Sequence, residues 1–206
     1  MKQLTVVKPP AGIALHHMAM ATPSVFLGGS IEMGKAEDWQ AKFIEDMQGM
    51  NLVVMSPRRD HWNPDLEQSI NCPEFVEQVE WELNHLDIAD HIVMNFIPGT
   101  MSPISLLEFG MYADSGKMLV CCPPGFWRKG NVEIVCKRFG IPLFENFDAL
   151  VEDYLWRIPA QNGVGRPKDL YFQLTDECDK LNDSIALEGL TDELKKKRED
   201  LIERMS

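Results

Sequence analysis

Short apolar runs alternate with amphipathic stretches from Pro23 to about Trp156, a pattern typical of βα units that build a parallel sheet. The apolar runs are bounded by turn residues, and we predict that they are strands. Near the N-terminus, Val6–Val7 and Ile13–Leu15 are possible extra strands. The five main predicted strands are Ser24–Leu27, Leu52–Met55, His91–Phe96, Met118–Cys121 and the weaker Ile141–Phe144, whose proline suits only an edge.

Apolar residues at helical spacing lie between the strands and predict helices there. Pro73 suits the first turn of a helix, and Gly49 suits a helix end. We therefore predict an α/β fold in which one three-layer domain carries a five-stranded, mostly parallel sheet. The predicted helices are Ala36–Gly49, Pro73–Ala89, Ile104–Ser115, Asn131–Phe139 and Phe147 to about Trp156.

The composition changes after Trp156. Pro159–Pro167 holds two prolines and two glycines, which is typical of a linker. Leucine and isoleucine residues at helical spacing follow, from Leu170 to Leu201, and form a narrow apolar stripe. We predict an α/β domain over residues 1–158 and a linker with a helical C-terminal tail over residues 159–206.

Charge and composition exclude several classes of function. The formal net charge is -12, which would repel a phosphate backbone, so no nucleic-acid polymer is expected as a partner. The sequence contains no apolar run of about 18 residues and no signal-peptide pattern, so we expect a cytoplasmic protein without a membrane segment. The five cysteines form no Cys-x-x-Cys pair and the histidines share no ligand spacing, so no metal site is expected.

The predicted topology locates the ligand site before any motif is considered, because parallel sheets bind ligands beyond the carboxyl ends of their strands. Four loops follow predicted strands and should meet at that edge. They are Gly28–Ser30, Ser56–Arg59, Pro98–Ser102 and Pro123–Gly125.

The most unusual residue near this edge is Glu108, a carboxylate in an otherwise apolar predicted helix. A glutamate favoured by the helix dipole is the alternative interpretation. A second acidic group lies on the helix that leads into the third strand, where Glu82 is the strongest candidate and Asp90 is better explained as a helix-end or turn residue. Two carboxylates at a sheet edge are typical of retaining glycosyl transfer, in which one is the nucleophile and the other handles the proton of the leaving group. That chemistry needs no metal or cofactor.

Several motifs occur in a fixed order over residues 23 to 150, and together they carry a resemblance. They are Phe26–Ile31, Trp39, Ser56–Arg59 with Trp62, Gln78–Glu82 with Ala89–Asp90, and Glu108–Gly110 before Gly116–Lys117. In this order they resemble the nucleoside 2-deoxyribosyltransferase superfamily. The resemblance implies a flavodoxin-like sheet, assembly into homodimers or larger oligomers, and transfer of deoxyribose from a 2'-deoxynucleoside to another free nucleobase.

The resemblance also implies roles for single residues. Glu108 matches the nucleophilic glutamate of the family, and Glu82 matches an aspartate that contacts the nucleobase and exchanges its proton. Asp90 is the alternative candidate for the role given to Glu82. Trp62 is the tryptophan best placed, near a strand-end loop, to stack on a base.

Further positions match the substrate pocket of the family. Gly29, Ser30 and Ile31 match the loop that lines the sugar and base. Ser102 matches a position that is often an acid in the transferases and a phosphate-binding serine in related nucleoside-monophosphate glycosidases. Asn131 matches an asparagine that family members lend to a neighbouring subunit.

The serines leave the choice between nucleoside and nucleotide open. A phosphate site uses backbone N–H groups, hydroxyls and usually an arginine. Glu32 stands where the nucleotide glycosidases carry a basic residue, which favours an uncharged nucleoside, whereas Arg58 and Arg59 would favour a nucleotide if they reached inward. Hydrolysis of nucleoside 5'-monophosphates and a non-catalytic nucleotide-binding or assembly module are the alternatives.

Overall fold

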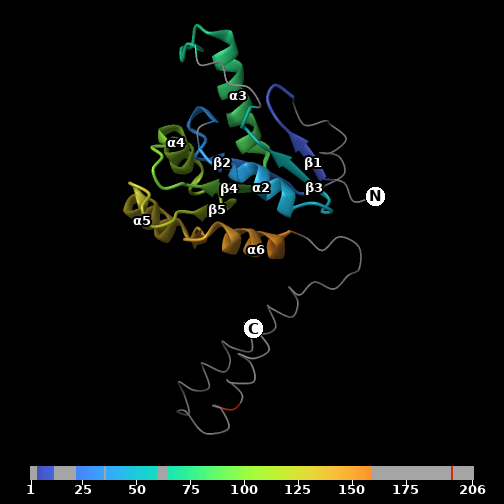
Figure 1. The fold of residues 1–206 in the computed structure, drawn as a ribbon, viewed down its shortest axis with the longest axis vertical. Helices are drawn as coiled ribbons and strands as arrows, with labels where there is room; N and C mark the ends of the chain where they lie inside the picture. Colours follow the sequence, from blue (N-terminus) through green and yellow to red (C-terminus); the bar gives the residue numbers. More distant parts are fainter. Residues whose placement is uncertain (1–3, 12–21, 35, 60–64, 159–195, 197–206) are drawn as a thin grey trace. The chain divides into compact units, whose positions relative to one another are not determined.

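The protein contains one parallel sheet, seen here in a computed structural model that describes residues 4–11, 22–34, 36–59, 65–158 and 196. The sheet order is β1-β3-β2-β4-β5-β6, and every neighbouring pair is parallel. The predicted tail, apart from Lys196, and the possible strand Ile13–Leu15 lie outside the described residues. The strands are β1 (Leu4–Val7), β2 (Ser24–Gly29), β3 (Leu52–Met55), β4 (His91–Asn95), β5 (Met118–Cys121) and β6 (Leu143–Phe144) (Figure 1).

The described sheet has six strands, so the prediction of five is wrong by one. The additional strand is β1, which pairs with β3 from Leu4↔Leu52 to Val7↔Met55. Its own apolar pattern is short, and its pairing with an already buried strand makes it part of the sheet. At the other edge, β6 is shorter than predicted, and the Pro142 carbonyl accepts a hydrogen bond from the Val120 N–H at 3.0 Å.

Helices cover both faces of this sheet, which gives a flavodoxin-like α/β fold (Figure 1). On one face α2 packs against α6, with the Phe43 and Tyr154 ring centroids 5.3 Å apart. On the other face, residues of α3, α4 and α5 such as Trp81, Phe109 and Val132 join one buried core with the strands. The helices are α2 (Trp39–Asp46), α3 (Pro73–Ile88), α4 (Pro103–Tyr112), α5 (Lys129–Phe139) and α6 (Phe147–Arg157), with a 3-10 turn at Glu32–Gly34.

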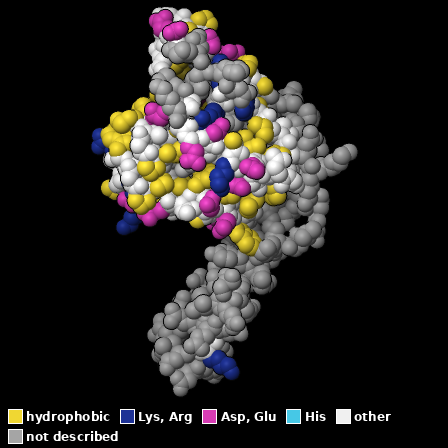
Figure 2. Space-filling model, in the orientation of Figure 1, with side chains coloured by type: hydrophobic (Ala, Val, Ile, Leu, Met, Phe, Trp, Pro, Cys, Tyr) yellow, Lys and Arg dark blue, Asp and Glu magenta, His cyan; other side chains and the backbone are white. Residues whose placement is uncertain are grey.

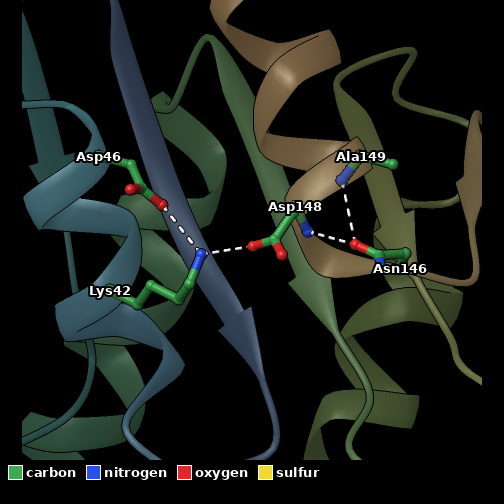
Figure 3. Close-up of polar contacts among 5 residues, drawn as sticks. All are labelled: Lys42, Asp46, Asn146, Asp148 and Ala149. Carbon is green, nitrogen blue, oxygen red and sulfur yellow. Dashed lines mark hydrogen bonds and ion pairs between the residues drawn. The ribbon is translucent and has the colours of Figure 1, made fainter.

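Polar contacts join α2 and α6 at the rim of their shared apolar contact (Figure 3). The Lys42 ammonium lies between Asp46 of its own helix and Asp148 of α6. The Asn146 side chain accepts hydrogen bonds from the N–H groups of Asp148, at 2.8 Å, and Ala149, at 3.2 Å. Asn146 therefore caps the start of α6, because these donors have no partner within the helix.

The centre of the sheet is a topological switch point. The chain passes from β2 to β3 on one side, whereas β4 lies on the other side of β2. In sheets of this kind the helices after the two halves leave in opposite directions, and the ligand-binding crevice expected between them lies at the carboxyl ends of β2 and β4. The end of β2 is exceptionally close to β4. Gly29 has φ +127°, and a Cβ built on it would lie 2.2 Å from the Asn95 carbonyl oxygen.

We expect Gly29→Ala to lower the free energy of unfolding by about 3 kcal/mol, since the added methyl clashes with backbone and its φ disfavours any side chain. Urea unfolding followed by circular dichroism measures this difference. Gly110→Ala is the control: a Cβ there meets nothing within 4 Å, and alanine favours the helix. Equal stability of Gly29→Ala and the wild type would contradict the close approach.

Candidate active site

Two loops meet at the switch point and are joined by a cluster of three hydroxyl groups. Ser30, after β2, lies with its Oγ 2.7 Å from both Thr100 Oγ1 and Ser102 Oγ, which belong to the loop after β4. The remaining hydroxyl pair, Thr100 and Ser102, is 2.9 Å apart. Thr100 also donates to the Ile97 carbonyl at 2.8 Å, and Ser30 Oγ accepts from the Ile97 N–H at 2.9 Å. The serines predicted to line the pocket are therefore in direct contact.

A carboxylate from the first loop binds the backbone just before the helix that follows the second. Glu32 Oε1 accepts hydrogen bonds from the backbone N–H groups of Met101, at 2.9 Å, and Ser102, at 2.8 Å. Both Glu32 and Ser102 have a left-handed backbone, with φ of 48° and 45°. Non-glycine residues adopt that conformation only when their surroundings hold it. The Glu32 side chain thus holds the backbone just before α4, where Ser102 makes no capping hydrogen bond with its own hydroxyl.

Glu108 lies on the inward face of α4. The side chain is 8% exposed, next to the buried Phe109. One turn earlier, the Ser105 hydroxyl donates to the Gly29 carbonyl at 2.7 Å, which ties the helix to the end of β2. Glu108 therefore follows a turn of α4 that is anchored at the switch point.

The outward face of α4 is apolar and exposed. Ile104 and Leu107 are each 60% exposed, and Met111 is 55% exposed. Figure 2 shows hydrophobic side chains gathered over α4 and α5. The helix therefore presents its polar candidate residue to the interior and an apolar stripe to the outside.

The Glu108 carboxyl group is in an environment that disfavours its charge. No described residue donates a hydrogen bond to it. Burial, the larger cause, and the negative charge of Glu82 together raise its pKa to about 8. The charges of the two carboxyl groups therefore act on each other.

Glu82 is in a different environment. It is partly buried in α3, and burial raises the pKa of its carboxyl group. Two groups oppose that effect: Gln78 donates a hydrogen bond to Glu82 Oε1 at 2.6 Å, and the positive charge of Arg59 acts in the same direction. The pair therefore combines one carboxyl group that has a donor and a nearby positive charge with one that has no donor among the described residues.

The structure places three of the other predicted site residues in different surroundings. Ile31 is half-buried in the loop after β2. Asn131 is exposed in the first turn of α5. Asp90 lies at the amino end of the sheet, where its Oδ2 accepts hydrogen bonds from the Ser24 N–H and Oγ. That end is opposite the crevice, so the structure does not bring Asp90 to Glu108. Trp62 lies outside the described residues.

The two arginines after β3 point to different partners. Arg58 donates to the carbonyl oxygens of Gly34, Ala36 and Glu37 and lies 3.4 Å from an Asp38 carboxylate oxygen. Arg59 donates from Nε to Gln78. Arg58 thus supports the loop after β2, and Arg59 supports the surroundings of Glu82.

Sequence reasoning did not assign three residues that build the site: Thr100, Ser105 and Gln78. Ser105 and Gln78 each have a local signal, because Ser105 lies one turn before Glu108 and Gln78 one turn before Glu82. Thr100 has no such local signal, and only its position in the loop after the third predicted strand relates it to the site. Across the described ranges, no three His, Cys, Asp or Glu side chains are arranged to hold a metal ion. No helix in those ranges is long and apolar enough to span a bilayer.

Comparisons with known proteins relate the region around this site to one family. A family model described as nucleoside 2-deoxyribosyltransferase like matches residues 22–126, which include Glu82 and Glu108 and make up just over half of the chain. No curated protein matches the sequence. A solved structure described as a conserved protein from Enterococcus faecalis V583 is 10% identical, covers 66% of this chain and 99% of its own, and superimposes with a TM-score of 0.50. At that identity the likeness supports the fold alone.

Proposed function

Because the chain belongs to the nucleoside 2-deoxyribosyltransferase-like family, we propose that it transfers deoxyribose from a 2'-deoxynucleoside to another nucleobase. The observation that carries this proposal is the pair formed by Glu108 and Glu82. Glu108 is buried without a hydrogen-bond donor among the described residues, and the charge of Glu82 acts on it. A carboxylate without donors keeps its lone pairs free for attack on carbon.

The proposed reaction has two steps. In the first, a Glu108 oxygen attacks the anomeric carbon, the bond from that carbon to the base nitrogen breaks, and Glu82 gives its proton to the departing base. In the second, the incoming base attacks the same carbon, the glutamyl ester breaks, and the proton of that base returns to Glu82. Protons and electron pairs balance without a metal or a cofactor.

The pair must hold one proton in total for this chemistry. In the free protein the raised pKa of Glu108, about 8, keeps a proton in the pair through neutral pH. Positive charge that develops on the sugar favours ionised Glu108, so the proton becomes available through Glu82 to the base.

The surroundings of the hydroxyl cluster favour a neutral substrate over a nucleotide. The N–H groups of Met101 and Ser102, just before the first turn of α4, are bonded to the Glu32 carboxylate. Thr100 donates its hydroxyl hydrogen to a carbonyl, and Arg58 donates to the carbonyl oxygen of Gly34. An anion near the start of α4 would therefore meet the negative charge of Glu32, which supports a nucleoside.

Incubation with single 2'-deoxynucleosides, with and without a different free base, tests the proposed function. Chromatography should detect a new nucleoside only when the second base is present. Free base in both reactions would instead indicate transfer to water. Parallel reactions with 2'-deoxynucleoside 5'-monophosphates test the preference for a neutral substrate. No turnover of any of these compounds would contradict the proposal.

We expect a bell-shaped pH dependence of kcat/KM. At low pH both carboxyl groups are protonated, so Glu108 cannot attack. Above about pH 8 the pair loses its last proton, and no acid remains for the departing base. Initial rates from about pH 5 to about pH 10 measure both limbs, and a rate that stays constant through pH 8 to 10 would contradict the assignment.

Assembly into a homodimer or larger oligomer belongs to the same proposal. The exposed apolar stripe of Ile104, Leu107 and Met111 supports it, because stripes of this kind commonly lie in interfaces. Light scattering coupled to size exclusion measures the mass of the particle, and a monomer at all concentrations would contradict this part.

A further inference from the structure

Glu82 lies at the end of a chain of three side chains from two elements. Gln78 lies one helical turn earlier on α3, and its Nε2 donates to Glu82 Oε1 at 2.6 Å. Arg59, in the loop after β3, donates from Nε to Gln78 Oε1. Gln78 is only 6% exposed, so bulk water does not replace these partners.

The orientation of the Gln78 amide is fixed by its three partners. Its Nε2 also donates to the Pro57 carbonyl, at 3.3 Å. A half-turn of the amide would place Oε1 against the Glu82 carboxylate and the Pro57 carbonyl, and the NH₂ group against the Arg59 guanidinium. All three contacts would then be repulsive. Gln78 therefore always presents a donor to Glu82, and Oε1 of Glu82 always acts as an acceptor there.

We propose that Gln78, oriented by Arg59, is a positioning residue: it occupies Oε1 of Glu82 and leaves Oε2 as the oxygen that carries the proton to and from the nucleobase. This proposal rests on the proposed function, because it divides a role of that reaction between the two oxygens of one carboxyl group. Neither Gln78 nor Arg59 needs to touch the substrate for this role.

The chain also accounts for the charge that Glu82 gains during the reaction. When the Oε2 proton passes to the base as the bond between sugar and base breaks, Glu82 becomes a carboxylate. The Gln78 amide and the Arg59 charge stabilise that form, whereas Glu108 from α4 opposes it until its own charge is lost in the ester bond. Arg59 and Glu108 are the charged groups that act on Glu82 from the neighbouring elements.

Gln78→Met is the first test, since methionine keeps the length of the side chain and removes the amide. We expect kcat to fall about 10- to 100-fold while KM changes less than about twofold, because the proton donor is misplaced but substrate contacts remain. The acid limb of the pH profile should move up by about one unit, since ionised Glu82 loses a donor. Asn84→Leu, at an exposed position of the same helix, is the matched control.

A double-variant cycle tests whether Arg59 acts through Gln78. Arg59→Met should shift the acid limb in the same direction, and Arg59→Met combined with Gln78→Met should cost clearly less than the product of the two single effects, because part of the Arg59 effect passes through Gln78. Arg59→Lys, which keeps the charge, should restore part of the lost rate. Independent, multiplicative effects of the two substitutions would overturn the chain.

A titration that does not depend on turnover separates this proposal from the proposed function. Carbon-13 NMR of the glutamate carboxyl groups, assigned with Glu82→Gln, should show a higher pKa for Glu82 in Gln78→Met than in the wild type. An unchanged titration overturns the proposal, even in a protein that transfers deoxyribose. The shift in a protein without any turnover would support the Gln78 contact and count against the proposed function.

Discussion

Glu108→Ala is expected to lower kcat for deoxyribosyl transfer by about 10⁴-fold or more, because it removes the attacking oxygen. No other Asp or Glu among the described residues is buried to the same extent and could replace it. The folded state should survive, since Glu108 makes no hydrogen bond with the described residues whose loss would leave a buried group unpaired. Steady-state rates with a deoxynucleoside and an acceptor base measure the loss. Glu80→Ala, which removes an exposed carboxylate from α3, should leave kcat within about twofold.

Azide provides a second measurement on the same variant. The space left by Glu108→Ala admits a small anion, which can attack the anomeric carbon in place of the carboxylate. Glu82 still supplies a proton to the base, so the products should be the free base and a deoxyribosyl azide. Full activity of Glu108→Ala without azide would exclude a glutamyl intermediate at this position.

Glu108→Gln should change how stability depends on pH, by an amount on the order of 4 kcal/mol in the free energy of unfolding. The pKa of this carboxyl group is about 8 in the folded protein and near 4.5 when the chain is unfolded. Below pH 4.5 the group is neutral in both states, and burial carries no charge penalty. Between pH 4.5 and pH 8 the unfolded chain releases this proton while the folded protein keeps it, so the wild type loses stability that the variant keeps.

Urea unfolding at a series of pH values measures this difference between wild type and variant. The gap should widen from pH 4.5 to pH 8 and remain constant above that range. A fixed offset from the buried amide does not depend on pH and does not affect the test. Glu80→Gln, at an exposed position, should show no such pH dependence. Parallel curves for Glu108→Gln and the wild type would contradict the burial of a charge-disfavoured carboxyl group.

The central part of the fold could be predicted from local pattern alone. Leu52–Met55 and Met118–Cys121 were predicted with the bounds that the structure has, because strands buried on both faces are continuous apolar runs. The helix predicted over Ala36–Gly49 is shorter, from Trp39 to Asp46, because Asp38 caps it by accepting from the Ala41 N–H. The strand β1 has little pattern of its own, so its existence depends on a neighbour far along the chain.

The site was less accessible to sequence reasoning. The position of Glu108 follows from the rule that ligands bind at the carboxyl ends of strands, and the same rule indicates that Asp90, which precedes β4, lies at the wrong end. The hydrogen bond from the Ser102 N–H to Glu32 joins residues about 70 positions apart. No periodicity encodes such a contact, because it depends on how two loops meet after the sheet has formed.

The joined loops have a consequence for how a ligand would be received. The hydroxyl cluster and the hydrogen bonds to Glu32 join the loops after β2 and β4 to each other. Their conformational entropy is therefore lost during folding, and association with a ligand has less disorder to remove. We therefore expect a ligand to bind at this crevice with little rearrangement of the two loops. Selectivity should depend on how well the shape of the ligand fits the preformed site.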